Sequence, residues 1–219
     1  NDEYAIYTST DGIKKAYMDG IGNVAEVNLT LVAMLKEAGF QAHPVLISTR
    51  SHGIPLYPTH DGFNYVIACV ESAGKIILFD ATESHSTPDN LPLRDLNWEG
   101  RIVKEDGTTA SVPLYPIVYS EQNTKLTSQM QGDGMITGTM ITSFNNLKGI
   151  EYRKDFGLMK ESDLKSTLES KYNQIQIEKV RLMIEHDISY GTNLHTPSGV
   201  RYVVYRAYWI DNQGKKFRK

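Results

Sequence analysis

A helix that is apolar on most of its circumference dominates the first part of the chain. Asn23 is a good N-cap, and Glu26 stands three residues later, where it completes a capping box. The apolar residues of this helix are Val24, Val27, Leu29, Leu31, Val32, Met34, Leu35 and Ala38. A helix of this kind is central in its fold, so we expect residues 23–38 to lie buried against a sheet, with Leu31 and Leu35 fully buried.

Three short apolar runs follow this helix and predict strands at residues 42–49, 65–70 and 75–79. The last two strands are separated by Glu-Ser-Ala-Gly at 71–74, which indicates a hairpin turn. A loop rich in proline and glycine, residues 50–62, connects the first two. One buried helix followed by an antiparallel meander predicts the α+β fold class.

The second half of the chain predicts more strand than helix. We place the boundary in the region that follows a segment rich in Pro, Asn and Asp, which gives a first domain of residues 1–110 and a second of 111–219. In the second domain, Gly132-Asp133-Gly134 indicates a hairpin turn, and Ser162 is expected to cap a polar helix. The expected strands are residues 125–130, 135–144, 175–184 and 200–210. This pattern is typical of a small β-rich domain with one or two helices.

Three motifs in the first region carry a resemblance to an enzyme superfamily. They are Gly22-Asn23-Val24-Ala25-Glu26, Phe63-Asn64-Tyr65-Val66 and Leu78-Phe79-Asp80-Ala81-Thr82. In order and spacing they resemble the transglutaminase-like superfamily, and MLKEAGF, PVLISTR and LPLRDLN are similar to bacterial multidomain members with flanking domains of unknown function. The resemblance covers residues 4–116 and continues more faintly to residue 187. It implies a papain-like core, truncated at its N-terminal end in this chain.

Two of the three catalytic positions of that superfamily are replaced here. Its members use a cysteine at a helix start, a histidine on a strand and an aspartate on the next strand. The resemblance places Val24 at the cysteine position and Tyr65 at the histidine position, which leaves only Asp80. Valine has no nucleophile, and tyrosine, with an ordinary pKa of about 10, is a poor base at neutral pH. We therefore predict no catalytic residue and no cofactor, with Asp80 orienting a hydroxyl or accepting backbone N–H groups.

Other reactive side chains do not predict a stronger site. Cys69 lies in an apolar run, so we interpret it as a buried, inert thiol. His52 and His60 share a loop with Asp61, and His43 lies nearby in the chain. Their spacing is wider than that of zinc ligands in proteins, so we predict no metal site.

Composition and charge exclude two classes of partner. A net charge of −3 gives no long-range attraction to nucleic acid or to anionic membranes. The sequence has no apolar run near the roughly 20 residues that span a bilayer, so we predict no membrane insertion. A single cysteine excludes an intramolecular disulfide. The chain begins without methionine, so we expect a processed or excised piece, and the resemblance favours the periplasm or the cell surface.

The leading functional hypothesis is a catalytically inactive transglutaminase-like domain that acts as a binding or scaffold module. A peptide or a glycan would bind in the former cleft between Val24, Tyr65 and Asp80, and other domains of the parent protein would be partners. The tyrosine-rich strand at 201–210 could stack on a sugar or peptide, although packing on a core is more common for such a strand. The alternative is a hydrolase or transferase of the peptidase or amidase class with displaced, thiol-independent catalytic groups.

Overall fold

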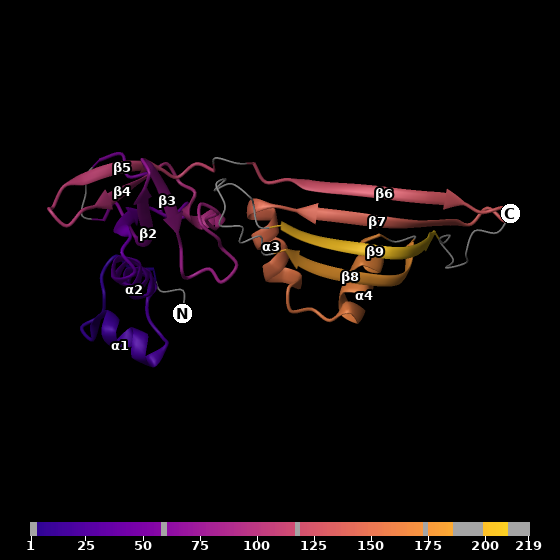
Figure 1. Ribbon diagram of the computed structural model, residues 1–219, viewed down its shortest axis with the longest axis horizontal. Coiled ribbons are helices and arrows are strands. Elements are labelled where there is room, and N and C mark those ends of the chain that lie inside the picture. Colours follow the sequence, from indigo (N-terminus) through magenta and orange to yellow (C-terminus); the bar gives the residue numbers. More distant parts are fainter. Residues whose placement is uncertain (1–3, 58–60, 117–118, 173–174, 186–198, 210–219) are drawn as a thin grey trace. The chain divides into compact units, whose positions relative to one another are not determined.

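The protein is described by a computed structural model in which two compact units can be separated, Asn1–Ile117 and Val118–Lys219. The structure describes residues 4–57, 61–116, 119–172, 175–185 and 199–209. In each unit an antiparallel sheet is combined with helices (Figure 1). The predicted α+β class is therefore confirmed.

The sheet of the first unit has the strand order β3-β2-β1-β4-β5. Its strands are β1 (Gln41–Ile47), β2 (Tyr65–Ser72), β3 (Lys75–Phe79), β4 (Glu99–Val103) and β5 (Thr109–Pro113). The turn between β2 and β3 has positive φ at both Ala73 and Gly74, as a two-residue hairpin loop requires. Strand β2 is the most deeply placed, because its first six residues are all buried.

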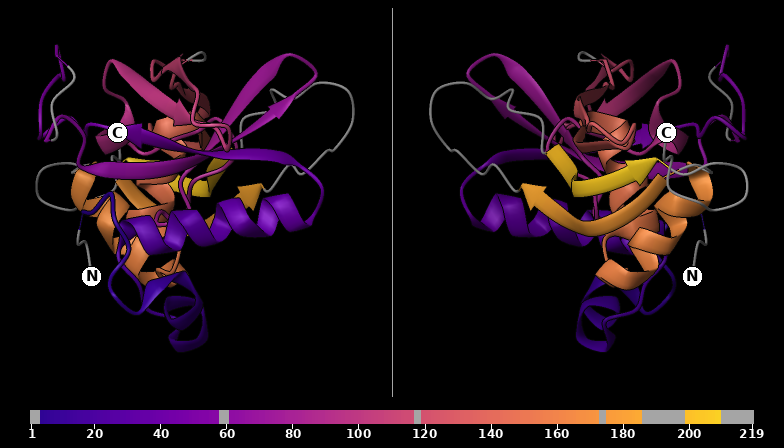
Figure 2. Two further views of the ribbon diagram at one scale, coloured as in Figure 1. Left: turned by 90° about the vertical axis from the view of Figure 1, so that its left-hand side faces the viewer. Right: turned by 90° about the vertical axis from the view of Figure 1, so that its right-hand side faces the viewer.

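Helix α2 (Val24–Glu37) lies along one face of this sheet against β1 and β2 (Figure 2). Its N-terminus has the predicted capping box. The buried face differs from the prediction by one helix position, because Asn28 and Val32 are buried while Leu31 and Leu35 are only partly buried. The expectation of full burial for these leucines was wrong, since Asn28 turns toward the sheet to make hydrogen bonds there. Helix α1 (Gly12–Asp19) packs on α2.

The division between the units falls later than the predicted boundary. A cut after residue 110 would pass through β5, which pairs with β4 in the sheet of the first unit. A short 3-10 helix, η1 (Leu93–Asp95), precedes β4 and lies in the segment expected to end the first domain. These elements had weak local signals, and the sheet pairing places them in the first unit.

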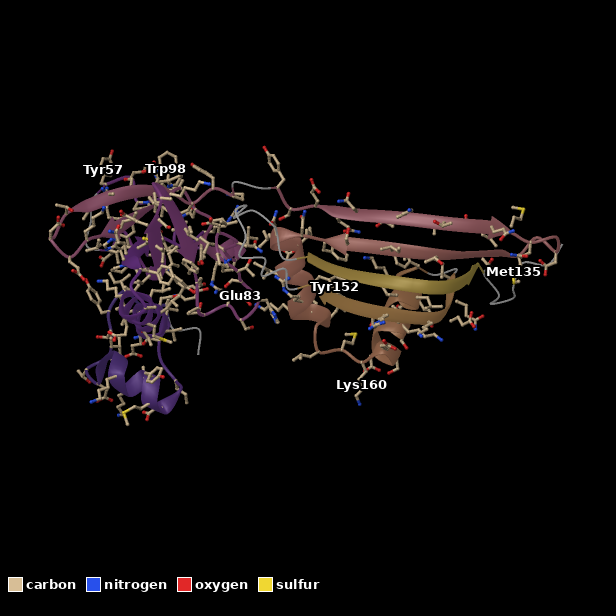
Figure 3. The ribbon with its side chains drawn as sticks, viewed as in Figure 1. Tyr57, Glu83, Trp98, Met135, Tyr152 and Lys160 are labelled. Atoms are coloured by element: carbon tan, nitrogen blue, oxygen red, sulfur yellow. The ribbon has the colours of Figure 1, made fainter. Side chains whose placement is uncertain are left out.

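The second unit combines a four-stranded sheet of order β6-β7-β9-β8 with two helices. Its elements are β6 (Gln122–Met130), β7 (Ile136–Phe144), α3 (Asn146–Phe156), α4 (Glu161–Lys171), β8 (Ile175–Glu185) and β9 (Gly199–Trp209). The Phe144 and Tyr152 rings stack at 4.4 Å, and Leu164 and Ile177 are buried in the same core. Figure 3 labels Tyr152 beside α3. Ser162 lies inside the first turn of α4, where its hydroxyl contacts Asp163, and is not the N-cap as predicted.

Candidate functional site

The start of α2, the start of β2 and the end of β3 meet at one end of the first sheet. Because β1, β2 and β3 are antiparallel, Tyr65 faces Ile47 at the end of β1, and Asp80 follows directly after β3. The Tyr65 hydroxyl donates to Asp80 Oδ2 at 3.1 Å. Val24, the first residue of α2, belongs to the same buried apolar cluster as Tyr65. The structure therefore joins Tyr65 and Asp80 directly and places Val24 in the same buried apolar cluster as Tyr65.

None of these three side chains is open to solvent. The exposed fractions are 4% for Val24, 0% for Tyr65 and 2% for Asp80. The ring of Tyr4 covers the Tyr65 ring edge-on, with 5.2 Å between centroids. The segment that follows Tyr4 is held at the start of α2, where the Ser9 backbone N–H donates to Glu26 Oε1 at 2.8 Å. A ligand has no access to the expected cleft between the three positions in this structure.

Asp80 accepts hydrogen bonds on both carboxylate oxygens. Oδ1 accepts from Asn28 Nδ2 at 3.0 Å, from the Thr82 backbone N–H at 2.9 Å and from the Thr82 hydroxyl at 2.7 Å. Burial favours the neutral acid, but the bonds from Asn28 and Thr82 and the charge of Arg94 outweigh it, so the pKa of Asp80 lies below its usual value. Asp80 is therefore an ionised structural carboxylate at neutral pH.

Arg94 links the residues of this end of the sheet into one cluster. Its Nη2 donates to Asp80 Oδ2 at 2.7 Å and to the Thr82 hydroxyl at 2.9 Å, and its Nε donates to the Tyr65 hydroxyl at 3.1 Å. Nη1 reaches Glu83 Oε2 at 3.4 Å. Burial lowers the pKa of Arg94, but Tyr65 and Asp80 more than compensate, so the pKa lies above its ordinary value. The side chain remains a cation with 25% of its surface exposed.

Tyr65 is held in its protonated form. Burial, followed by the negative charges of Asp80 and Asp95, raises the pKa of Tyr65 above its ordinary value. Because the hydroxyl donates to Asp80 and accepts from Arg94, it has no role as a base near neutral pH. The replacement of histidine by tyrosine thus converts the position into a structural link.

Asp95 is a second buried carboxyl in the cluster, with no exposed surface. In the described part of the chain, neither of its oxygens accepts a hydrogen bond, and Arg94 Nε lies 3.7 Å from Oδ1. Hydrogen bonding between the Asp95 and Asp80 carboxyl groups favours the protonated form of Asp95. Burial, followed by the charge of Asp80, raises the pKa of Asp95 to about 9. Asp95 is therefore a neutral acid at pH 7, and the cluster contains a carboxyl poised to titrate above that pH.

The remaining reactive groups lie apart from this cluster. Cys69 is fully buried in β2, and burial raises the pKa of its thiol to about 11, as expected for an inert thiol. His43 lies on β1 opposite Cys69, His52 Nε2 contacts the backbone oxygen of Asp61 at 2.8 Å, and His60 lies outside the described residues. Among the residues that the structure describes, no group of three metal-ligating side chains is found.

An open groove of about 330 Å³ adjoins the same end of the sheet. It is lined by Ser48, His52, Ile54, Pro55, Leu56, Tyr57, Asp61 and Gly62. Leu56 and Tyr57 are 72% and 74% exposed, and Tyr57 projects from the surface in Figure 3. The Ser48 hydroxyl donates to the backbone oxygen of Gly53 at 2.7 Å, so its proton is not directed at His52. The groove therefore offers apolar and aromatic contact surface, without an activated nucleophile.

Sequence reasoning assigned no role in the site to five members of the cluster: Asn28, Thr82, Glu83, Arg94 and Asp95. Asn28 carried one signal, since it is a polar residue inside an apolar helix. Arg94 and Asp95 lie within LPLRDLN, which resembles the bacterial multidomain proteins, but that motif did not indicate that they join this cluster. The burial of Asp95 and the partial burial of Arg94 depend on where η1 lies in the fold.

The site is an arginine–carboxylate–tyrosine cluster, with buried Tyr65 and Asp80 and a partly buried Arg94, at one end of the sheet of an α+β unit. Comparison with known protein families, with curated proteins and with solved structures gave no match. In the described residues, no helix has the length and apolar character needed to cross a membrane. The side chains of the tyrosine-rich strand, residues 201–210, lie outside the described residues.

Proposed function

We propose that the first unit is a non-catalytic transglutaminase-like domain that acts as a binding or scaffold module for a peptide or a glycan. The observation that carries this proposal is the hydrogen bond between Tyr65 and Asp80 at one end of the sheet, with Val24 in the same buried apolar cluster as Tyr65. The resemblance assigns these three positions to a thiol triad, in which Val24 supplies no nucleophile and Tyr65 no available base. Arg94 binds both Asp80 and Tyr65, which gives the position a structural role.

The proposed ligand surface is the open groove that adjoins the same end of the sheet as the Arg94 cluster. Its exposed side chains include the aromatic ring of Tyr57 and the aliphatic side chain of Leu56. His52 and Asp61 are polar residues of the same groove. Aromatic rings beside a few polar groups are suited both to sugar rings and to apolar side chains of an extended peptide.

A binding screen tests this proposal directly. The whole chain is applied to an array of short peptides and soluble oligosaccharides, and binding is then measured in solution for the best probe. Tyr57→Ala and Leu56→Ala should each weaken binding about tenfold or more, because an aromatic or aliphatic anchor is lost. Tyr17→Ala is the matched control, since Tyr17 is 67% exposed but lies on α1. Equal effects of Tyr57→Ala and Tyr17→Ala would overturn the assignment of the groove.

Restoring the triad tests the family relationship. In a Cys69→Ala background, Val24→Cys places the only thiol at the first position of α2, where the helix terminus lowers the pKa of a thiol below about 8.5. Adding Tyr65→His should accelerate iodoacetamide alkylation near neutral pH, because Asp80 would orient the new imidazole. Alkylation profiles that are the same with and without the imidazole would show that the two positions do not communicate.

A further inference from the structure

Strand β6 forms one edge of the second sheet, and Figure 1 shows it on the side away from α4. No described strand pairs with its outer edge, so alternate N–H and C=O groups along the strand point away from the sheet. All nine residues from Gln122 to Met130 are exposed. Edge strands are usually protected by proline, by a bulge, by being short or by charged side chains, lysine above all. Strand β6 has no proline and a continuous register with β7, and its one charged residue is Lys125.

The apolar side chains of β6 face the side of the sheet that carries the helices. Leu126 stands opposite Met140, which packs against the core around Phe144 and Tyr152. Helices α3 and α4 lie against β7, β8 and β9. Leu126 and Met130 therefore keep 54% and 70% of their surface exposed although they lie on the core side. An additional strand beside β6 would cover this apolar surface.

We propose that β6 pairs antiparallel with β6 of a second copy of this chain, joining the two sheets into one. Along an antiparallel ladder, hydrogen-bonded pairs alternate with pairs that are not hydrogen-bonded. Two identical strands related by a two-fold axis can keep this alternation only when one residue faces its own copy across the axis. Leu126 is the middle residue of Gln122–Met130. An axis through Leu126 is thus the register that pairs the full length of the strand.

The charges and apolar groups of β6 are compatible with this register. Lys125 is the only charged residue of the strand, and it would stand opposite Thr127 of the second copy. Leu126 would face Leu126, which buries two exposed aliphatic side chains against each other. An axis one residue earlier would place Lys125 opposite itself, and like charges that face each other destabilise a strand pair. Pairing of two β6 strands is therefore favoured in the register centred on Leu126 and disfavoured in the register centred on Lys125.

The first experiment measures the mass of the whole chain by light scattering over a wide concentration range. We expect a concentration-dependent dimer. Thr127→Glu should tighten it roughly three- to tenfold, because each new carboxylate faces Lys125 of the other copy. Gln129→Glu is the matched control with the same change of charge, but it faces Asn123 and should give no comparable gain. Leu126→Lys should weaken the dimer more than about tenfold, because it sets two like charges face to face.

The second experiment identifies the register by cross-linking. Leu126→Cys places two thiols opposite each other at a separation that a disulfide can bridge, so mild oxidation should give a covalent dimer. Ser128→Cys lies on the same face but would stand opposite Thr124, so it should remain uncrosslinked. Native Cys69 is buried and does not interfere. A monomer at all concentrations, equal cross-linking of both variants or equal effects of Thr127→Glu and Gln129→Glu would each overturn the proposal.

Discussion

Strand β2 of the first unit and strand β6 of the second represent two extremes of strand environment. The first six residues of β2 are all buried, on both faces of the sheet. All nine residues of β6 are exposed, although some lie on the core side. The difference follows from the sheet orders, because β2 lies inside its sheet under α2 and β6 lies at an edge beyond the helices. The first unit buries a cluster of carboxyl groups, whereas the buried polar groups described in the second unit are Thr142 and Arg153.

The interiors of the two units differ in the same way. The first unit buries Asp80 and Asp95 beside the cation of Arg94, together with the amide of Asn28. The second unit has an aliphatic and aromatic core that includes Leu164 and Phe144, and it buries Arg153 and Thr142 without a buried carboxylate among its described residues. A buried ion pair adds little stability compared with apolar packing, but removing one partner is very costly. The two units should therefore respond differently to substitution.

The largest effect is expected for Arg94→Met. This change leaves Asp80 buried without its cation and should cost the first unit about 3–5 kcal/mol. Amide hydrogen exchange measures the protection of both units in one experiment. The amides of β2 should lose protection, while the amides of β7 should keep theirs. The matched control is Arg101→Met, because Arg101 is exposed on β4. Unchanged protection of β2 would mean that the cluster does not stabilise the first unit.

A packing substitution should have the reverse selectivity. Leu164 has no exposed surface in the core of the second unit, so Leu164→Ala should cost that unit about 2–4 kcal/mol through lost burial and a cavity. The expected result is faster exchange of β7 amides with unchanged exchange of β2 amides. Leu158→Ala is the control, since Leu158 is completely exposed. Loss of protection in both units would show that they unfold as one and would break the comparison.

The pH dependence of the first unit should come largely from Asp95. Its folded pKa of about 9 lies above the unfolded value, so the folded state binds more protons between the two values. Stability should therefore fall as pH rises from 5 to 8, by at most about 1.4 kcal/mol per pH unit. Asp95→Asn cannot titrate and should flatten this slope. Urea-unfolding midpoints at several pH values measure it, and parallel slopes for both proteins would exclude Asp95 as the cause.

The smallest effect is expected for Tyr65→Phe. The ring stays in the core, and only the hydroxyl that joins Arg94 to Asp80 is lost. The expected cost is about 1–2 kcal/mol, measured by the same unfolding transition. A cost equal to that of Arg94→Met would show that the hydroxyl and the guanidinium act as one unit.

Local signals in the sequence were sufficient for the elements that carry strong patterns. The capping box at Asn23 and Glu26 predicted where α2 begins, because cap chemistry involves residues only three positions apart. The apolar runs of β1, β2 and β3 and the turn at Gly74 were predicted for the same reason. The three motif positions also indicated side chains that would lie together: Tyr65 and Asp80 are hydrogen-bonded, and Val24 belongs to the same buried apolar cluster as Tyr65.

The tertiary structure decided which polar residues are buried and what they contact. The side of α2 that faces the sheet, with Asn28 inward and Leu31 only partly buried, depends on the hydrogen bonds to the Val66 backbone and Asp80, far away in sequence. Arg94 became the centre of the cluster because η1 and β4 return the chain to the sheet. Burial and the charges of neighbours set the protonation of Asp95, and both depend on contacts between distant segments.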